Sequence, residues 1–364
     1  MSEAAFLYSD ARFRVIGEPR VSVPELAQPV LAEAHRALVE HPDARLTRCL
    51  CGAAGEERRV SAADRHGLPF NLVLCRTCGL IRVNPQPSPE RLRWFYAEVY
   101  RRLYGPFAKD DAALFDSKLW KGELVRRGLS SSGLALPKAG EPIVDLGCGG
   151  GWTLAPFAAE RPCIGFDFDE RLIAIGRARG LDLRLGGVER ALADGVRAAL
   201  VILGHVLEHT LDPEAELRAL APLLADGGLL YVEVPHTRRI GGAALRSDSA
   251  CYWQRAHLWD FQRGHLAALL ERAGYRVLWT SEDENSVFTL SRWGGTLEPS
   301  PWPRLGPDVE AQLLGFERRH SSLAERAPRV VEAARRAAKE GSGLLRRVLT
   351  RVTPASGPGA RARS

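Results

Sequence analysis

The spacing of hydrophobic residues changes near residue 141 and divides the chain into two parts. Beyond that point, short and nearly continuous apolar runs alternate with segments in which apolar residues recur every three or four positions. The short runs are typical of strands buried on both faces, and the longer spacing is typical of amphipathic helices. We expect strands at 143–146, 163–166, 181–185, 199–203 and 229–234, and helices at 153–160, 170–179, 213–223 and 263–273.

This alternation predicts an α/β fold with a mostly parallel sheet. Parallel neighbours need a crossover connection, and the intervening helices provide it while covering both faces of the sheet. Two further strands, 275–281 and 286–293, are joined by an acidic turn. We expect them to form an antiparallel hairpin at the edge of the sheet.

The first 140 residues follow a different pattern. A short helix is expected at 31–39, a strand at 70–74, and a stiff proline-rich break at 84–89. The next helix carries Leu92, Phe95, Tyr96, Val99 and Tyr100 at helical spacing, another helical pattern covers 112–129, and 308–352 is helical near the C-terminus. We therefore divide the chain into a lead-in (1–45), a cysteine module (46–90), a helical cap and linker (91–140), an α/β domain (141–295) and a helical, basic C-terminal tail (296–364).

The positive charge of the chain is concentrated at its C-terminal end. The formal net charge is +6, but residues 341–364 contain five arginines and no acidic residue, so the other residues carry only +1. A nearly neutral body argues against nucleic acid as a partner. Leucines and valines alternate with arginines in 344–352. This pattern leaves two interpretations open, namely a helix that contacts a membrane surface or a partner protein, and a solvated helix that frays.

The sequence predicts a cytoplasmic protein without a transmembrane segment. No apolar run approaches the roughly 18–20 residues that a membrane span requires. The N-terminus, Met1-Ser2-Glu3, carries an acidic residue where a signal peptide would carry a basic one, and no apolar segment follows.

Four of the seven cysteines are grouped in two pairs. Cys49 and Cys51 form the first pair, and Cys75 and Cys78 form the second. In a reducing compartment two such pairs indicate a tetrahedral four-thiolate zinc site rather than disulfides, and buried thiols without a metal are the alternative. Because four thiolates leave no open coordination position, the predicted zinc is structural.

A glycine-rich loop follows the first strand of the α/β part. It runs Asp145-Leu-Gly147-Cys-Gly149-Gly-Gly151, and Asp167 ends the next strand, where a carboxylate can accept both hydroxyl groups of a ribose. A dinucleotide-binding loop is one interpretation. However, the acidic residue would repel a pyrophosphate and attract the cationic amino group of S-adenosylmethionine (AdoMet), and the loop has no lysine. We therefore expect AdoMet as the cofactor.

Several stretches resemble class I AdoMet-dependent methyltransferases. The segment 143–151, Ile-Val-Asp-Leu-Gly-Cys-Gly-Gly-Gly, resembles their first motif, and Gly165-Phe-Asp167 resembles the second. The stretches 206–213 and 220–235 resemble the region around strands four and five in one branch of that family. The resemblance covers about 141–290 and implies a Rossmann-like sheet of seven strands in which only the last strand is antiparallel.

The resemblance also implies roles for individual residues. Gly204 and His205 would line the cofactor at the end of the fourth strand. The adenine contacts stay open, because Gly186 and Gly187 stand where many relatives have an acidic residue, so backbone groups or Glu189 would substitute. The methionine end of AdoMet would be held by Asp145, Gly147, Gly149 and Gly151, and the ribose by Asp167.

The N-terminal part resembles the zinc-binding front domain of nucleotide-sugar C-methyltransferases and related enzymes. The resemblance rests on Cys75-Arg-Thr-Cys78-Gly-Leu, the proline-rich break and the tyrosine-rich helix. It implies a cap that faces the substrate. In the sugar enzymes the histidine of a Glu-His pair removes a proton, and Glu208 and His209 match that pair. We therefore expect His209 to be the general base, with Glu208 orienting it or acting in its place. Packing at the start of a helix is the alternative role for His209.

The stretch His205-Val-Leu-Glu-His209 also matches the inverted zinc-protease motif H-x-x-E-H. That motif needs both histidines on one face of an established helix. Here it straddles the end of a strand, and Pro213 follows within four residues. We therefore do not favour a protease.

Two aromatic segments have two possible roles. The first contains Tyr96, Tyr100 and Tyr104, which either face the substrate or belong to the core. The second is the insertion 251–261, which contains Arg255 and His257 and is expected to form a wall of the substrate site, a small core of its own, or both.

These observations lead to two hypotheses about function. The first is AdoMet-dependent methyl transfer to an oxygen or carbon of a small polar metabolite, with a nucleotide-linked sugar or glycan precursor favoured by the resemblance. The second is a non-catalytic AdoMet-fold binding protein whose zinc module recruits a partner.

Overall fold

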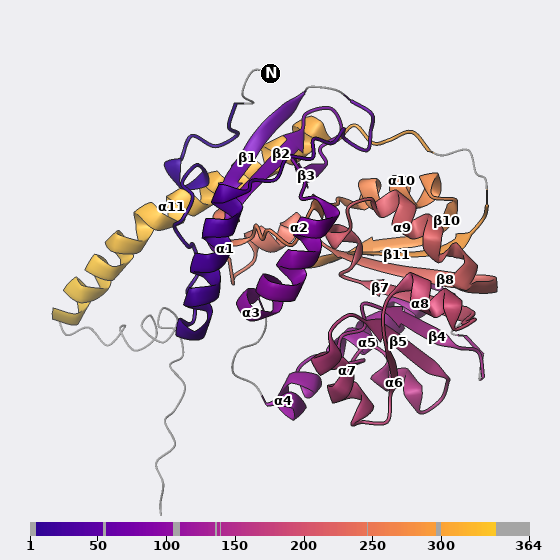
Figure 1. Ribbon diagram of the computed structural model, residues 1–364. Helices are drawn as coiled ribbons and strands as arrows, with labels where there is room; N and C mark the ends of the chain where they lie inside the picture. Colours follow the sequence, from indigo (N-terminus) through magenta and orange to yellow (C-terminus); the bar gives the residue numbers. More distant parts are fainter. Residues whose placement is uncertain are drawn as a thin grey trace, which may run out of the picture.

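The computed structural model describes residues 5–53, 56–104, 110–134, 137–138, 140–245, 247–295 and 300–339, and contains two sheets. Figure 1 shows the smaller, N-terminal sheet and helix α11 (Gly306–Lys339) on one side of the molecule and the larger sheet on the other. The alternating pattern at 344–352 lies outside the described residues. None of the described helices combines the length and the apolar character needed to cross a membrane.

The larger sheet has seven strands in the order β10-β11-β8-β7-β4-β5-β6. β4 to β8 pair in parallel, whereas β11 pairs antiparallel with both β8 and β10. The predicted α/β class and the single antiparallel strand are thereby confirmed, and β11 is inserted between β8 and β10. The strands are β4 (Ile143–Leu146), β5 (Cys163–Asp167), β6 (Asp182–Leu185), β7 (Ala198–Gly204), β8 (Leu224–Pro235), β10 (Tyr275–Glu282) and β11 (Ser286–Trp293).

Both faces of this sheet are apolar because successive strand residues point to opposite sides. On β4, Val144 belongs to one buried cluster and Ile143 to another, and the same alternation holds for Val201 and Leu200 on β7. The first cluster includes residues of α8 (Val188–Ala193), α9 (Pro213–Leu220) and α10 (Arg263–Arg272). The second includes residues of α5 (Trp120–Ser132), α6 (Ala155–Ala158) and α7 (Glu170–Arg177).

The smaller sheet has four strands in the order β1-β2-β3-β9, all antiparallel. Sequence analysis predicted only part of β2 (Pro69–Cys75); β1 (Glu57–Ala63) and β3 (Ile81–Val83) were not predicted. The fourth strand, β9 (Trp259–Asp260), belongs to the insertion after β8. The predicted boundary between a 46–90 module and a 141–295 domain therefore does not separate the two sheets, because β9 adds to the smaller one.

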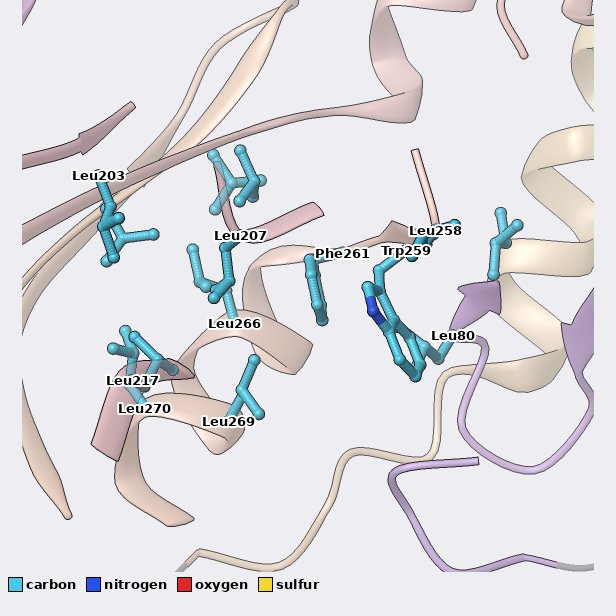
Figure 2. Close-up of a cluster of buried hydrophobic side chains, with 14 of the residues drawn as sticks. Leu80, Leu203, Leu207, Leu217, Leu258, Trp259, Phe261, Leu266, Leu269 and Leu270 are labelled. Carbon is cyan, nitrogen blue, oxygen red and sulfur yellow. The ribbon is translucent and has the colours of Figure 1, made fainter. Parts of the chain in front are cut away.

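The two sheets also share one hydrophobic core. Leu80, next to β3, and Leu203, on β7, belong to the same buried cluster. Figure 2 shows how Leu258, Trp259 and Phe261 of the insertion lie between these two regions. The N-terminal module is thus packed onto the larger sheet rather than tethered to it.

The helices that cap this junction differ from the expected ones. α1 (Gln28–Glu40) is longer than predicted, and the helix after the proline-rich break contains a π-helical segment. The predicted helix 112–129 is interrupted by a turn at 117–119. α6 is shorter than predicted because the glycine loop occupies the first turn of the expected helix. In that turn the carbonyl of Gly151 accepts a hydrogen bond from the backbone N–H of Ala155. The remaining helical elements are η1 (Ala11–Phe13), η2 (Glu25–Ala27), α2 (Pro89–Trp94), η3 (Phe95–Tyr100, the π-helical segment), α3 (Arg101–Tyr104), α4 (Asp111–Asp116), η4 (Leu207–His209), η5 (Ala221–Leu223), η6 (Thr237–Gly241) and η7 (Ser249–Cys251).

Candidate functional site

The glycine loop brings the predicted AdoMet residues together at the carboxyl ends of β4 and β5. Gly147, Gly149 and Gly151 all have positive φ angles, of 74°, 55° and 76°. The loop is closed onto the neighbouring strand end, because the backbone N–H of Gly149 donates to Oδ2 of Asp167 over 2.7 Å. Ligands of parallel α/β sheets bind at this edge, so the loop is placed where a nucleoside cofactor would lie.

Asp145 has an unusual environment for a carboxylate. Its side chain is buried, and Oδ2 has no hydrogen-bond partner among the described residues. Burial raises the pKa of Asp145 to about 8, although Lys121 opposes the shift. A buried carboxylate oxygen without a partner is costly, so it favours a ligand with a positively charged donor. The amino group of AdoMet is such a donor, and in this respect the residue fits the cofactor.

Asp167 keeps spare acceptor capacity beside the loop. Oδ1 accepts the backbone N–H of Asp169 over 2.8 Å, and Oδ2 accepts that of Gly149. A carboxylate offers about four lone-pair positions, and the guanidinium of Arg101 makes a long third contact of 3.5 Å to Oδ1, so two ribose hydroxyl groups would use the remaining position and displace Arg101. Arg101 lies 3.5 Å from Oδ1 of Asp167 and 2.8 Å from Oδ2 of Asp169. Sequence analysis missed this arginine, which joins the cap to the cofactor edge.

An exposed aromatic ring follows Asp167 directly. The side chain of Phe168 is 77% exposed, and a Cβ atom at Gly187 would lie 3.2 Å from its ring. An apolar ring of this exposure at the ligand edge of the sheet is typical of a base-stacking position. Phe168 was not identified from the sequence, although its position immediately after Asp167 was a usable signal.

Gly204 and His205 end β7 beside the loop. A Cβ atom at Gly204 would meet no other atom within 4 Å, and His205 has a positive φ of 58°. Its backbone N–H donates to the carbonyl of Glu233, and its Nε2 lies 3.0 Å from Oε1 of that residue. Burial lowers the pKa of His205, but Glu208 and Glu233 outweigh it and raise the pKa to about 9. His205 is therefore a cation held between two carboxylates.

Glu208 lies at the centre of a cluster of three imidazoles. Its side chain is fully buried, and Oε1 is 3.4 Å from His205 Nδ1, 3.6 Å from His209 Nε2 and 3.9 Å from His257 Nε2. Burial raises the pKa of Glu208, but the three histidines together outweigh it and lower the pKa to about 2. The carboxylate is therefore ionised. Neither oxygen makes a hydrogen bond of normal geometry with a described residue.

The hydrogen bonds of His209 leave one ring nitrogen free to accept a proton. Nδ1 lies 2.8 Å from the carbonyl of Ala256 and 2.7 Å from the hydroxyl of Tyr96. A carbonyl only accepts, so it holds the proton on Nδ1 and leaves the lone pair on Nε2. Burial lowers the pKa of His209 despite the nearby Glu208 carboxylate, so the ring is neutral at pH 7.

The geometry excludes the H-x-x-E-H protease motif. The motif requires a helix, but η4 is a single 3-10 turn. The ring of His205 is directed to Glu233 instead of sharing a helix face with His209.

The insertion contributes aromatic side chains to the core and brings His257 to the candidate site. Trp253, Trp259 and Phe261 are buried, whereas His257 approaches Glu208. The backbone N–H of Leu258 donates to the carbonyl of Glu208 over 2.8 Å, which fixes this segment against the end of β7. The aromatic residues of the insertion therefore belong to the core shared by the two sheets rather than to a small core of their own, and the role as a substrate wall stays a prediction.

The three tyrosines differ in their surroundings. The rings of Tyr96 and Tyr100 both lie 6.0 Å from the ring of His209. Tyr104 stacks on Tyr100 and donates its hydroxyl hydrogen to Asp64 in the N-terminal module. The π-helical segment thus directs Tyr96 and Tyr100 to the candidate base, and Tyr104 belongs to the interior of the cap.

The four paired cysteines converge as a metal site requires. The Sγ atoms of Cys49 and Cys78 are 3.5 Å apart, those of Cys51 and Cys75 are 3.8 Å apart, and all four lie within 4.8 Å of one another. Tetrahedral zinc with Zn–S bonds of about 2.3 Å places its sulfurs about 3.8 Å apart, so the residues fit this metal. His265 of α10 lies 2.8 Å from the carbonyl of Cys78, which connects the cluster to the larger sheet.

Comparison with known proteins supports a methyltransferase. Residues 120–279 match the family described as a methyltransferase domain. The ubiquinone biosynthesis O-methyltransferase of Xanthomonas axonopodis pv. citri is 32% identical over 159 residues, which cover 39% of this chain and 65% of the relative. The C-methyltransferase NovU of Streptomyces niveus is 25% identical over 237 residues, or 63% of this chain and 50% of the relative.

The matches extend over only part of each relative. The chain spans between 41% and 65% of the length of the two ubiquinone O-methyltransferases matched first. The solved structure of the mitomycin 7-O-methyltransferase MmcR covers 50% of this chain and 56% of its own, with 20% identity and a TM-score of 0.39. Residues 120–279 thus match a methyltransferase-domain family, and the sheet order and the glycine loop agree with this match.

Proposed function

We propose that the protein transfers a methyl group from AdoMet to an oxygen or carbon atom of a small polar metabolite. The observation that carries this proposal is the position of His209, whose unprotonated Nε2 lies in a buried cluster at the same sheet edge as the glycine loop. Methyl transfer needs bound AdoMet and a proton acceptor at the same edge of the sheet. The glycine loop would bind the AdoMet, and His209 would accept the proton.

The cofactor would be held by the residues of the β4 and β5 ends. Asp145 would accept a hydrogen bond from the amino group of AdoMet, and Asp167 would accept the ribose hydroxyls. We further propose that Phe168 and the backbone of Gly187 line the adenine, in place of the acidic residue that many relatives carry. When bound, AdoMet supplies the electrophilic methyl carbon.

The proton would be removed by His209. Its Nδ1–H is anchored by the carbonyl of Ala256, so the ring cannot rotate freely and Nε2 stays directed into the cluster. The carboxylate of Glu208, 3.6 Å away, stabilises the imidazolium after proton transfer. In this scheme Glu208 contributes through its negative charge beside His209.

The acceptor is proposed to be a nucleotide-linked sugar or glycan precursor. Similarity to NovU, whose name describes a C-methyltransferase, and to ubiquinone O-methyltransferases supports both possible acceptor atoms. Tyr96 and Tyr100 of the π-helical segment lie against His209, and the four-cysteine module is proposed to hold structural zinc that stabilises the front domain. The cap is where the acceptor would bind.

The test is methyl transfer by the purified full-length chain. AdoMet is incubated with nucleotide-linked keto-sugars and polar phenols, and both S-adenosylhomocysteine and the methylated acceptor are measured by mass spectrometry. Turnover that disappears in the His209→Gln variant supports the proposal. AdoMet binding without turnover on any acceptor favours the non-catalytic binding protein instead, and failure to bind AdoMet contradicts both.

A further inference from the structure

The side chains of Glu208, His209 and His257 form a compact group with metal-ligating atoms. One carboxylate oxygen and two imidazole nitrogens lie within 4.8 Å of one another. In a tetrahedral zinc site with bonds of about 2.0–2.2 Å, neighbouring nitrogen and oxygen ligands are about 3.3–3.5 Å apart. Oε1 of Glu208 is 3.6 Å from His209 Nε2 and 3.9 Å from His257 Nε2. The two Glu–His distances therefore exceed the tetrahedral values by a few tenths of an ångström, and the two imidazoles, whose ligand atoms lie within 4.8 Å of each other, would close around the ion.

The environment of Glu208 gives an independent indication of a ligand. The side chain is fully buried, and both oxygens lack a hydrogen-bond partner among the described residues. Buried carboxylates are normally hydrogen-bonded, paired or bound to a metal. Glu208 is paired with the His205 cation over 3.4 Å, and the same oxygen faces the imidazoles of His209 and His257 at 3.6 and 3.9 Å. The carboxylate therefore keeps acceptor positions for a further ligand.

Both histidines present the lone pair that a metal needs. The N–H at Nδ1 of His209 is bound to the carbonyl of Ala256, and metal-ligating histidines usually make such a bond with their second nitrogen. The side-chain amide nitrogen of Gln254 contacts Nε2 of His257. An amide nitrogen only donates hydrogen bonds, so Nε2 of His257 accepts this one through its lone pair. A metal ion would take the place of this amide at His257.

We propose that Glu208, His209 and His257 bind one transition metal ion of the Zn²⁺, Co²⁺ or Ni²⁺ type, and that the bound ion inhibits methyl transfer. Three protein ligands leave one position for water, in contrast to the four-cysteine site, where every position is filled. Inhibition follows because the lone pair of His209 Nε2 is donated to the metal and is no longer available for a proton. This second half of the proposal rests on the proposed role of His209 as the base.

Metal stoichiometry tests the site without any need for activity. The full-length protein is saturated with Zn²⁺, passed through a desalting column, and its zinc measured by elemental mass spectrometry. We expect two ions per chain for the wild type and for the control His320→Gln, and one ion for His257→Gln. Removal of the competing amide in Gln254→Ala is expected to tighten binding of the second ion. One ion in the wild type, or two in His257→Gln, would overturn the proposal.

Inhibition is then measured relative to each protein's own rate before Zn²⁺ is added. Wild-type turnover is expected to fall as the second site fills, whereas the rate of His257→Gln is expected to keep its metal-free value at the same concentration. Equal inhibition of both proteins contradicts the inhibitory role. If two ions bind but no acceptor is methylated, the metal site is supported and the proposed function fails. If one ion binds and an acceptor is methylated, the proposed function is supported and the metal site fails.

Discussion

The phenolic oxygen of Tyr96 lies 2.7 Å from Nδ1 of His209, although 113 positions separate the two residues in the sequence. The contact joins the π-helical segment of the cap to the end of β7. Tyr96 is thus placed to orient the candidate base, and the cap contributes a contact to the proposed active site.

Replacing His209 by glutamine is expected to lower kcat by about 10²–10⁴-fold, the usual contribution of a general base. AdoMet affinity should change little, because His209 is not among the residues proposed to hold the cofactor. Steady-state kinetics and calorimetric AdoMet binding check the two parts. His320→Gln, far along the chain on α11, is the control and should keep the wild-type rate. A His209 variant with normal kcat would show that another residue is the general base.

The pH dependence of the rate follows from the burial of His209. Burial lowers its pKa below the ordinary value of 6.5, so the unprotonated base persists below neutrality and is lost only when the pH falls through the lowered pKa. The rate should therefore be flat from about pH 6.5 upwards and decline on the acid side. In Tyr96→Phe the position of this acid limb is expected to shift, because the hydroxyl at Nδ1 is removed. An unchanged profile would argue that Tyr96 only packs against the ring.

AdoMet binding should release a proton from Asp145. With a pKa of about 8, this carboxyl group is mostly protonated at pH 7 in the free protein, and the cationic amino group of the cofactor favours its ionised form. Calorimetry at pH 7 in two buffers of different ionisation enthalpy should show close to one proton released per AdoMet. The release at pH 7 should vanish in Asp145→Asn. Buffer-independent heats in the wild type would contradict this prediction.

Gly149→Ala is expected to weaken AdoMet binding strongly. A Cβ atom there would lie 2.5 Å from the Trp152 ring, and φ is +55°. Gly180→Ala is a matched control, because its φ is +80° but its Cβ atom would meet nothing within 4 Å. Both variants should lose about 1–2 kcal/mol of unfolding free energy from the left-handed backbone. Only Gly149→Ala should lose AdoMet affinity. If both variants bind AdoMet equally well, the glycine loop is not part of the AdoMet site.

Loss of one thiolate should release the structural zinc. Cys75→Ser is expected to abolish the thiolate charge-transfer absorption of the Co²⁺-substituted protein and to lower Tm by at least several degrees, since metal binding contributes to folding. Cys163→Ser, outside the four-cysteine group, should keep the absorption. An unchanged spectrum in Cys75→Ser would show that Cys75 is not a ligand.

The larger sheet could be predicted because its signals are local. Apolar runs such as 143–146 and 199–203 are buried on both faces, so period and length identify them without knowledge of their partners. The same holds for Asp145, which lies near the end of β4, and Asp167, which ends β5.

The rest depends on contacts between distant segments. β9 has two residues and exists only because it pairs with β3. The π-helical segment has an ordinary helical pattern, and the approach of His257 to Glu208 depends on how the insertion folds back on β7. No periodicity in the sequence encodes these contacts.

The pairing of β9 with β3 has a consequence for how the chain can be cut or recombined. Residues 259–260 complete a sheet whose other strands precede residue 84. A fragment limited to the matched segment 120–279 would leave this strand without its neighbour and uncover Trp259 and Phe261 to water. We therefore expect such a fragment to aggregate, and an exchange of acceptor specificity between relatives to require transfer of the front module together with the insertion.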